Sequence, residues 1–124
     1  MDFGSGRLAP EELQHRVGAL ALCFIAYADG VPAGTASLDI RDVEIDGKPL
    51  RCAFFKALGV LPKYAGMGIA TRLFEEREKA ARALFCRRIY VCTHPHNQRA
   101  IDLFLRLGYR RPDPEKAAFE KDLP

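Results

Sequence analysis

The sequence has little excess charge of either sign. It contains 19 lysines and arginines against 16 aspartates and glutamates, a net charge of +3 with neutral histidines. A balance this close to neutral does not by itself indicate binding to nucleic acid, so we expect no nucleic-acid partner.

The four cysteines lack the C-x-x-C spacing typical of zinc sites and redox motifs. Three of them lie inside apolar runs, and the set predicts reduced core residues of a cytoplasmic protein. They are Cys23, Cys52, Cys86 and Cys92.

No stretch of the sequence has the character of a membrane span or of an export signal. The apolar residues 17–28 come nearest, but Glu11 and Glu12 precede them and the turn-forming pair Asp29-Gly30 ends them. We therefore expect no membrane partner.

A chain of 124 residues can bury one hydrophobic core but not two, which predicts a single domain over residues 1–124. Residues 1–8 carry glycine and serine with little apolar content, and we expect them to be disordered. Arginines crowd the C-terminal half, where they form either a surface for a polyanionic cofactor or a solvated basic face. These arginines are Arg82, Arg87, Arg88, Arg99, Arg106, Arg110 and Arg111.

The first half of the sequence alternates apolar runs with turn signals. Pro10 opens a short predicted helix that ends at Gly18. Residues 19–28 and 31–40 are typical of strands, and they flank Asp29-Gly30, a two-residue hairpin signal. The pattern predicts an antiparallel hairpin.

A second hairpin signal, Asp46-Gly47, separates residues 43–45 from the long apolar run 50–61. These segments are predicted as a third and a fourth strand, so at least three antiparallel strands come first. Over residues 69–85 the apolar period changes to three and four, which indicates an amphipathic helix packed on the sheet. Residues 88–93 return to strand, and because a helix separates this strand from the preceding one, the two are predicted to be parallel.

The C-terminal part is predicted as a helix followed by a hairpin. Asn97 is a suitable N-cap for a helix over residues 97–107, and Gly108 ends it. Residues 109–111 and 117–123 then form the final hairpin.

This order is organised around residues 57–74, where an apolar strand breaks at Pro62, passes a glycine-rich turn and restarts as a helix. Gly66 and Gly68 leave the backbone amides of residues 66–71 uncovered at a helix N-terminus, which supplies unpaired N–H donors and a positive dipole. The turn is interpreted as an anion site, most simply for phosphate, with a purely structural loop as the alternative. A nucleotide phosphate loop is disfavoured because the Gly-Lys-Ser/Thr ending is absent.

Two motifs in register resemble a known family. Residues 60–70 read Val-Leu-Pro-Lys-Tyr-Ala-Gly-Met-Gly-Ile-Ala, and residues 97–104 read Asn-Gln-Arg-Ala-Ile-Asp-Leu-Phe, with Leu-Gly-Tyr at 107–109. Both are similar to the acetyl-CoA-binding motif and the following helix of the GCN5-related N-acetyltransferases (GNAT). The resemblance covers about residues 18–123.

The resemblance implies an α/β (α+β) acyl-CoA N-acyltransferase fold. Its central sheet is mixed and mostly antiparallel, has one parallel pair of strands splayed at their ends, and is flanked by helices. Family members usually begin with an extra strand and two helices, so the resemblance also implies a trimmed N-terminus. Those helices usually wall the acceptor side, and a partner subunit of a homodimer is one way to supply what is absent.

The family implies acetyl-CoA as co-substrate, held by the strand-turn-helix segment 57–85. The pantetheine arm would pair with the main chain of Leu58 and Val60, and the amides of residues 66–71 would hold the pyrophosphate. Gly59 suits either a close backbone approach or a flexible spot in a strand. The predicted cofactor-binding residues are Leu58, Gly59, Val60, Ala65, Gly66, Met67, Gly68, Ile69, Ala70, Thr71, Asn97 and Phe104.

The glycine motif departs from the family pattern at its head. Ala65 stands where members usually have Arg or Gln, which removes a polar side chain but leaves the amides intact. Lys63 and Arg72 are the predicted substitute cations.

The usual catalytic side chains are also absent. Phe104 stands where many members have the Tyr that protonates the leaving thiolate, and Phe54 stands where histone-type members carry a Glu base. The ionisable groups nearest to Phe54 are Lys56 and, beyond it, Cys52. Positioning and a main-chain donor for the oxyanion can still supply much of the rate.

His94 is the candidate catalytic residue, a general base at the C-terminal end of the fifth strand. The alternative is that His94 and His96 belong to an ordinary turn. We expect no metal site there, because a third ligand is lacking.

The sequence therefore predicts an N-acetyltransferase that moves acetyl from acetyl-CoA to a primary amine of a small molecule or a protein. The alternative is a GNAT-like module that binds acyl-CoA or a protein partner and has lost the chemistry.

Overall fold

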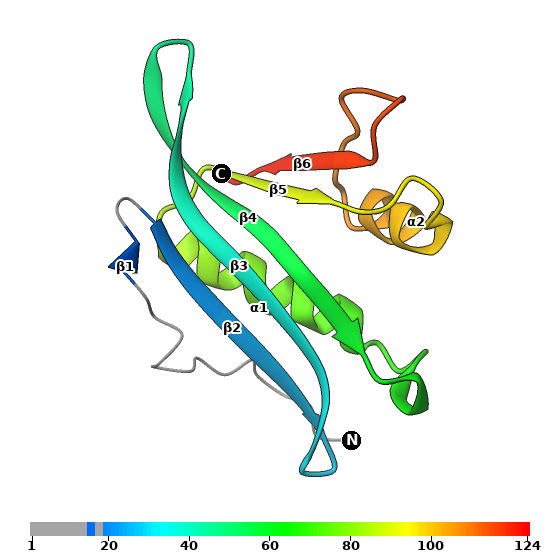
Figure 1. The fold of residues 1–124 in the computed structure, drawn as a ribbon. Helices are drawn as coiled ribbons and strands as arrows, with labels where there is room; N and C mark the ends of the chain where they lie inside the picture. The colour runs from blue at the N-terminus through cyan, green and yellow to red at the C-terminus, as the bar shows by residue number, and fades with distance from the viewer. Residues whose placement is uncertain (1–14, 17–18) are drawn as a thin grey trace.

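The computed structural model describes residues 15–16 and 19–124, in which six strands form one sheet whose order follows the chain (Figure 1). The bounds are β1 (His15–Arg16), β2 (Ala19–Ala28), β3 (Val31–Ile45), β4 (Lys48–Val60), the 3-10 turn η2 (Pro62–Tyr64), α1 (Ile69–Ala83), β5 (Arg88–Cys92), α2 (Gln98–Arg106) and β6 (Ala118–Asp122).

The N-terminal expectations fall almost entirely outside the described residues. This holds for the predicted disorder of residues 1–8 and for most of the predicted helix that begins at Pro10. Where the structure does describe this stretch, the prediction is wrong, because His15 and Arg16 form strand β1, paired antiparallel with β2.

Both predicted hairpins are confirmed. Asp29 and Gly30 have φ of 52° and 77°, and Asp46 and Gly47 have φ of 53° and 75°, which is the pattern of the type I′ turn that suits twisted strands. One boundary was wrong, because β3 runs without a break from Val31 to Ile45, where the sequence predicts two strands. The antiparallel pairing with β4 continues through these residues and so decides the matter.

The predicted parallel pair is also confirmed. β4 and β5 pair in parallel from Cys52 opposite Arg88 to Phe55 opposite Val91, and β6 then pairs antiparallel with β5. Beyond the last of these pairs the two parallel strands point in diverging directions (Figure 1). The predicted C-terminal hairpin is reduced to a single bridge between Arg110 and Glu120.

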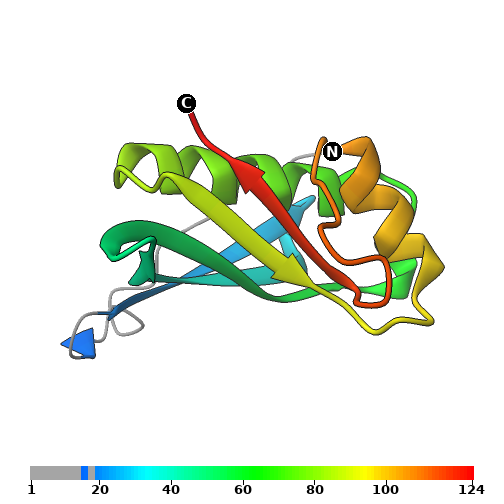
Figure 2. The same cartoon turned by 90° about the horizontal axis from the view of Figure 1, so that it is seen from above.

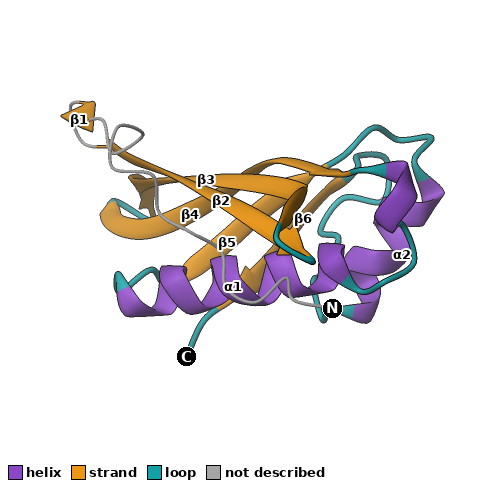
Figure 3. Ribbon diagram, turned by 90° about the horizontal axis from the view of Figure 1, so that it is seen from below, coloured by secondary structure: helices purple, strands orange, loops and turns teal. Residues whose placement is uncertain are grey.

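Helix α1 lies along one face of the sheet (Figure 2), over β2, β3 and β4. Its apolar side chains, among them Leu73 and Phe74, are buried against that face. Helix α2 joins the same layer (Figure 3), because the ring of Phe104 packs 5.4 Å from Phe74 and 5.2 Å from Phe119 between centroids. These contacts join α2 and β6 to the hydrophobic core between α1 and the sheet.

The end of α1 differs from the prediction. The helix stops at Ala83, and Phe85, which the sequence places on its apolar face, is 81% exposed with a positive φ of 64°. The amide of Cys86 donates to the carbonyl of Ala81 at 2.9 Å, which closes the helix end around a left-handed residue.

The cysteines are free, but only two of them are core residues. Cys52 and Cys86 are buried, Cys23 is half-buried and Cys92 is exposed. The interpretation of the set as core residues is therefore wrong for Cys92, which lies at the end of β5.

Candidate functional site

The glycine-rich turn joins the end of β4 to α1. The amide of Leu61 donates to the carbonyl of Ala33 at 2.9 Å, which anchors the entry to the turn. Gly66 and Gly68 have φ of 78° and 81°, in the left-handed region that favours glycine. A Cβ at either glycine would meet no atom within 4 Å, so the turn is open to solvent.

Gly68 is also the N-cap of α1, and no side chain caps the helix. The first intrahelical bond runs from the amide of Arg72 to the carbonyl of Gly68 at 3.0 Å, so the amides of residues 69–71 have no intrahelical acceptor. These amides and the helix dipole make the turn a site for an anion.

A groove of about 620 Å³ runs past this turn. One wall is formed by the glycine turn and the first turn of α1, and the other is formed by Asn97, Arg99 and Arg106 at and along α2. The predicted substitute cations are not on these walls. Lys63 is exposed to solvent outside the groove, and the Nε atom of Arg72 pairs with the carboxylate of Glu76 at 3.0 Å.

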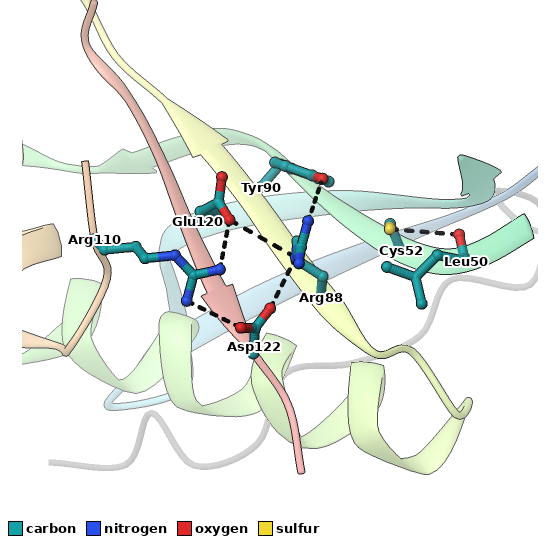
Figure 4. A network of polar contacts seen from close by, with 7 residues as sticks. All are labelled: Leu50, Cys52, Arg88, Tyr90, Arg110, Glu120 and Asp122. Atoms are coloured by element: carbon teal, nitrogen blue, oxygen red, sulfur yellow. Dashed lines mark hydrogen bonds and ion pairs between the residues drawn. The ribbon is translucent and has the colours of Figure 1, made fainter. Parts of the chain in front are cut away.

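Four of the seven C-terminal arginines lie at two different sites. Arg99 and Arg106 face the groove. Arg88 and Arg110 instead belong to an ion-pair network with Glu120 and Asp122 on the outer strands (Figure 4). These two arginines hold the pKa of the Asp122 carboxyl below its usual range. Of the two sequence alternatives, a cofactor surface stays a prediction for the pair that lines the groove, and the ion-pair network accounts for the other pair.

A second cavity, a slot of about 350 Å³, lies where β4 and β5 part. Lys56, Ala57 and Leu58 line it from β4, and Cys92 lies on its opposite side at the end of β5. Asn97 borders both cavities, as do two apolar residues of α2, so the slot and the groove share a wall. A ligand with a phosphate end and a long arm can occupy both.

The backbone of β4 is distorted beside the slot. Pairing with β3 shifts between Ala36, opposite Leu58, and Ser37, opposite Lys56, so Ala57 forms a bulge. Gly59 lies beyond the bulge, paired with Thr35, and a Cβ there would meet nothing within 4 Å. Its role in a close approach of the cofactor stays a prediction. The two strands themselves approach closely at Gly34 on β3, where a Cβ would lie 2.9 Å from the carbonyl oxygen of Gly59.

The structure brings most of the predicted cofactor residues together. Leu58 and Phe104 line the slot, and Val60, Ala65, Gly66, Gly68, Ile69, Ala70 and Thr71 line the groove. Met67 is exposed outside both, and Gly59 lines another cavity, between the start of β3 and the end of β4. Asn97 caps α2, its Oδ1 accepting from the amide of Ala100 at 3.1 Å.

His94 lies in the exposed loop after β5, where its Nδ1 accepts from the amide of His96 at 3.3 Å. It is on the walls of neither cavity, and its catalytic role stays a prediction. The ionisable side chains on the walls of the slot are Lys56, Arg77 and Cys92, and none of the lining residues is a carboxylate or a histidine.

At the two positions where family members usually carry the acid and the base, this chain has packed phenylalanines. Phe104 is buried in the wall of the slot. Phe54 lies on the sheet face opposite α1, stacked 5.1 Å from Tyr90 with the guanidinium of Arg41 3.9 Å above its ring. Neither can exchange a proton.

Sequence reasoning missed Arg77, which is fully buried in α1 and lines the slot. Burial lowers the pKa of its guanidinium to about 10. The signal was present, because Arg77 occupies an apolar position in the period of the helix. Arg99 and Arg106 were noted only as members of a basic cluster.

Among the described residues, no group of three or more histidines, cysteines, aspartates or glutamates is arranged to hold a metal ion. No helix in the same part of the chain has the length and apolar character needed to cross a membrane.

Comparison with solved structures supports the assignment of the fold. The chain superposes on the PaiA N-acetyltransferase of Thermoplasma acidophilum, in complex with coenzyme A, with a TM-score of 0.69 at 20% identity, covering 83% of this chain and 61% of that one. For Arabidopsis thaliana NAA60, in complex with a bisubstrate analogue, the TM-score is 0.68 at 21% identity, with 82% and 75% covered.

The aminoglycoside N-acetyltransferase AAC(6')-Iy, in complex with coenzyme A, is similar at 28% identity, with a TM-score of 0.69 and coverage of 83% of this chain and 75% of that one. No curated protein matches the chain in sequence. The chain spans 61% of the length of the Thermoplasma protein.

A mixed sheet with one parallel splayed pair, a glycine turn opening a helix, and a slot between the splayed strands define an acyl-CoA N-acyltransferase fold. The model of the acetyltransferase (GNAT) family matches residues 4–109. The chain therefore belongs to the GNAT acetyltransferase family, whose co-substrate is acetyl-CoA.

Proposed function

We propose that this protein transfers an acetyl group from acetyl-CoA to a primary amine of a small molecule or a protein. The observation that carries the proposal is the shared wall of the two cavities. The glycine turn offers unpaired amides for a pyrophosphate, and the slot beside the β4 bulge accommodates an arm that ends in a thioester. One ligand with the shape of acetyl-CoA fits both.

In the proposed reaction a neutral amine attacks the carbonyl carbon of the thioester. The new C–N bond forms, the C–S bond breaks, the attacking nitrogen gives up one proton, and coenzyme A leaves as a thiolate that takes up one proton, so no net proton is released. The lining of the slot has no carboxylate or histidine to act as a base, so positioning and main-chain donors near Leu58 would supply most of the rate. Cys92 and Lys56 are the exposed ionisable groups beside the thioester.

The test is release of free coenzyme A thiol in the presence of acetyl-CoA and a panel of amines. Aminoglycosides belong on the panel because AAC(6')-Iy, at 28% identity, is an aminoglycoside N-acetyltransferase. Polyamines, amino acids and lysine peptides cover the other classes of primary amine. No thiol release above the rate without protein, with every amine, would refute the proposal.

Arg99 and Arg106 are proposed to bind the phosphates of the co-substrate in place of the polar side chain lost at Ala65. Arg99→Gln and Arg106→Gln should each weaken acetyl-CoA binding about fivefold, less at high salt because screening reduces the attraction. Arg82→Gln, an exposed arginine away from the groove, is the matched control. Ala65→Arg should tighten binding through a charge-assisted contact to phosphate.

A second candidate function is binding of acyl-CoA without turnover. The phenylalanines at positions 54 and 104 favour it, because they remove the usual base and acid. Calorimetry and thiol detection on the same sample discriminate the two candidates. The transferase predicts binding and thiol release, and the binding module predicts binding alone.

We also propose a homodimer in the cytoplasm. Among the described residues no helix covers the sheet face opposite α1, which carries Phe54 and Tyr90, so a second subunit has room to complete the acceptor side. Free cysteines suit a reducing compartment. Sedimentation equilibrium tests the dimer, since a monomer at micromolar concentration would contradict it.

A further inference from the structure

Arg77 is a buried cation in the middle of α1. Its side chain is 1% exposed, and its guanidinium packs against two neighbouring aromatic rings, with Cζ 4.3 Å from the centroid of Phe55 and 4.6 Å from that of Phe74. Cation–π contacts of this kind offset part of the cost of burial.

The Nη1 group donates two hydrogen bonds to main-chain carbonyls on different strands. One goes to Ser37 on β3 at 3.0 Å, and the other goes to Lys56 on β4 at 2.9 Å. Ser37 and Lys56 are paired residues at the point where the β3–β4 register shifts. Arg77 therefore fastens α1 to both strands at the pair of residues next to the bulge.

Stability alone is a poor reason to keep an arginine at this position. Its Nε and Nη2 atoms are buried without a hydrogen-bond partner, and no carboxylate pairs with Arg77 in the part of the chain that the structure describes. Buried charges are often replaced by apolar side chains of similar volume with no loss of stability or with a gain. An apolar side chain could not, however, hold the two carbonyls.

Those carbonyls lie where β4 loses its pairing with β5. The ladder with β5 ends at Phe55, and the residues that follow line the slot. From Lys56 onward the strand has no β5 partner on one side and a shifted β3 register on the other. The main chain along the slot is then held by the shifted ladder with β3, from Leu58 opposite Ala36 onward, and at Lys56 by Arg77.

We infer that Arg77 is a positioning residue, which fixes the β4 bulge and so sets where the main chain of residues 57–60 meets the acyl group of acetyl-CoA. For turnover this inference rests on the proposed transferase function. The groove at the glycine turn does not include Arg77, so binding of the phosphate portion of coenzyme A should not depend on it.

The test compares Arg77→Met with Arg77→Lys and with Lys79→Met, an exposed control on the same helix. Methionine keeps the volume without donors, whereas the lysine ammonium keeps donors for the carbonyls. In Arg77→Met we expect amide hydrogen exchange at residues 57–60 to accelerate at least tenfold. We also expect kcat to fall at least tenfold, while Kd for ADP, which carries the pyrophosphate without the pantetheine arm, stays within threefold. Arg77→Lys should recover part of both losses, and Lys79→Met should match the parent.

Two results would overturn the inference. The first is an Arg77→Met protein with the exchange rates and kcat of the parent. The second is a parallel loss of melting temperature, ADP affinity and kcat, which marks a residue of general structural importance. If the parent binds acetyl-CoA but releases no thiol with any amine, the transferase proposal fails separately, and the exchange measurement in Arg77→Met still decides for or against Arg77.

Discussion

Replacing Gly68 by valine tests the anion site at its centre. Gly68 caps α1 with φ of 81° and ψ of 9°, in the left-handed region. A residue with a Cβ pays about 1–2 kcal/mol there, which lowers the melting temperature by about 4–8 °C for a domain of this size. No atom lies within 4 Å of the added Cβ, so backbone strain is the whole expected cost to the fold.

The cost to binding has a different origin. A branched side chain at Gly68 covers the amides of residues 69–71 and shifts them if the backbone relaxes. A hydrogen bond to a charged group contributes about 1.5–3 kcal/mol, so loss of a single phosphate contact should weaken acetyl-CoA binding at least tenfold, or about 1.4 kcal/mol. Isothermal titration calorimetry measures this change.

Gly47 offers a matched control at the far hairpin. Its φ is 75°, and a Cβ there would also meet nothing within 4 Å. Gly47→Val should show a similar loss of stability with unchanged affinity for acetyl-CoA. If Gly68→Val is folded and binds acetyl-CoA as tightly as Gly47→Val, the amides do not hold the phosphates, and the assignment of the groove is wrong.

Three further predictions concern the fold. Phe85→Gly should raise the free energy of unfolding by about 1 kcal/mol in urea titrations, because the left-handed φ of 64° suits glycine and the exposed ring loses little. Gly34→Ala should destabilise by about 1–3 kcal/mol, because its Cβ would lie 2.9 Å from the Gly59 carbonyl oxygen, whereas Gly59→Ala should cost far less. Burial raises the pKa of the Cys52 and Cys86 thiols. Their contribution to stability is therefore complete below the unfolded pKa of about 8.5 and is lost as the pH rises through the folded values.

Each of these has a clear contrary outcome. An unchanged or lower stability of Phe85→Gly would mean that the exposed ring makes contacts worth more than the strain. Equal losses in Gly34→Ala and Gly59→Ala would contradict the close approach. For the thiols, urea titrations from pH 7 to 9.5 should show a shallower decline in the Cys52→Ala/Cys86→Ala double variant, and an identical decline would assign the pH dependence to other groups.

Local signals in the sequence were sufficient for most of the fold. Each Asp-Gly pair is a complete turn signal within two residues, and the change of period at Ile69 reports which side of α1 faces the sheet. The continuation of β3 through Arg41 was not predictable in this way. It depends on pairing with β4. The exposed polar residues of this stretch do not indicate that pairing.

The site was predictable where the backbone makes it and less so where side chains do. The glycines of the turn were identifiable because their function is conformational. For Arg77 the helical period indicated burial but not its partners, because Ser37 and Lys56 are 40 and 21 residues away in the sequence. Which arginines face the groove is likewise a tertiary question, since Arg99 and Arg110 look alike in a basic cluster.

The order of strands in the sheet, which repeats the order in the chain, has a consequence for folding kinetics. The β2–β3–β4 meander can form from near neighbours, because two-residue turns close its ladders with little loss of loop entropy. The β4–β5 ladder can form only after α1, which connects the two strands, has packed across the sheet. We expect this junction to be consolidated last and to open first, and because the slot lies there, a bound acyl-CoA should slow unfolding.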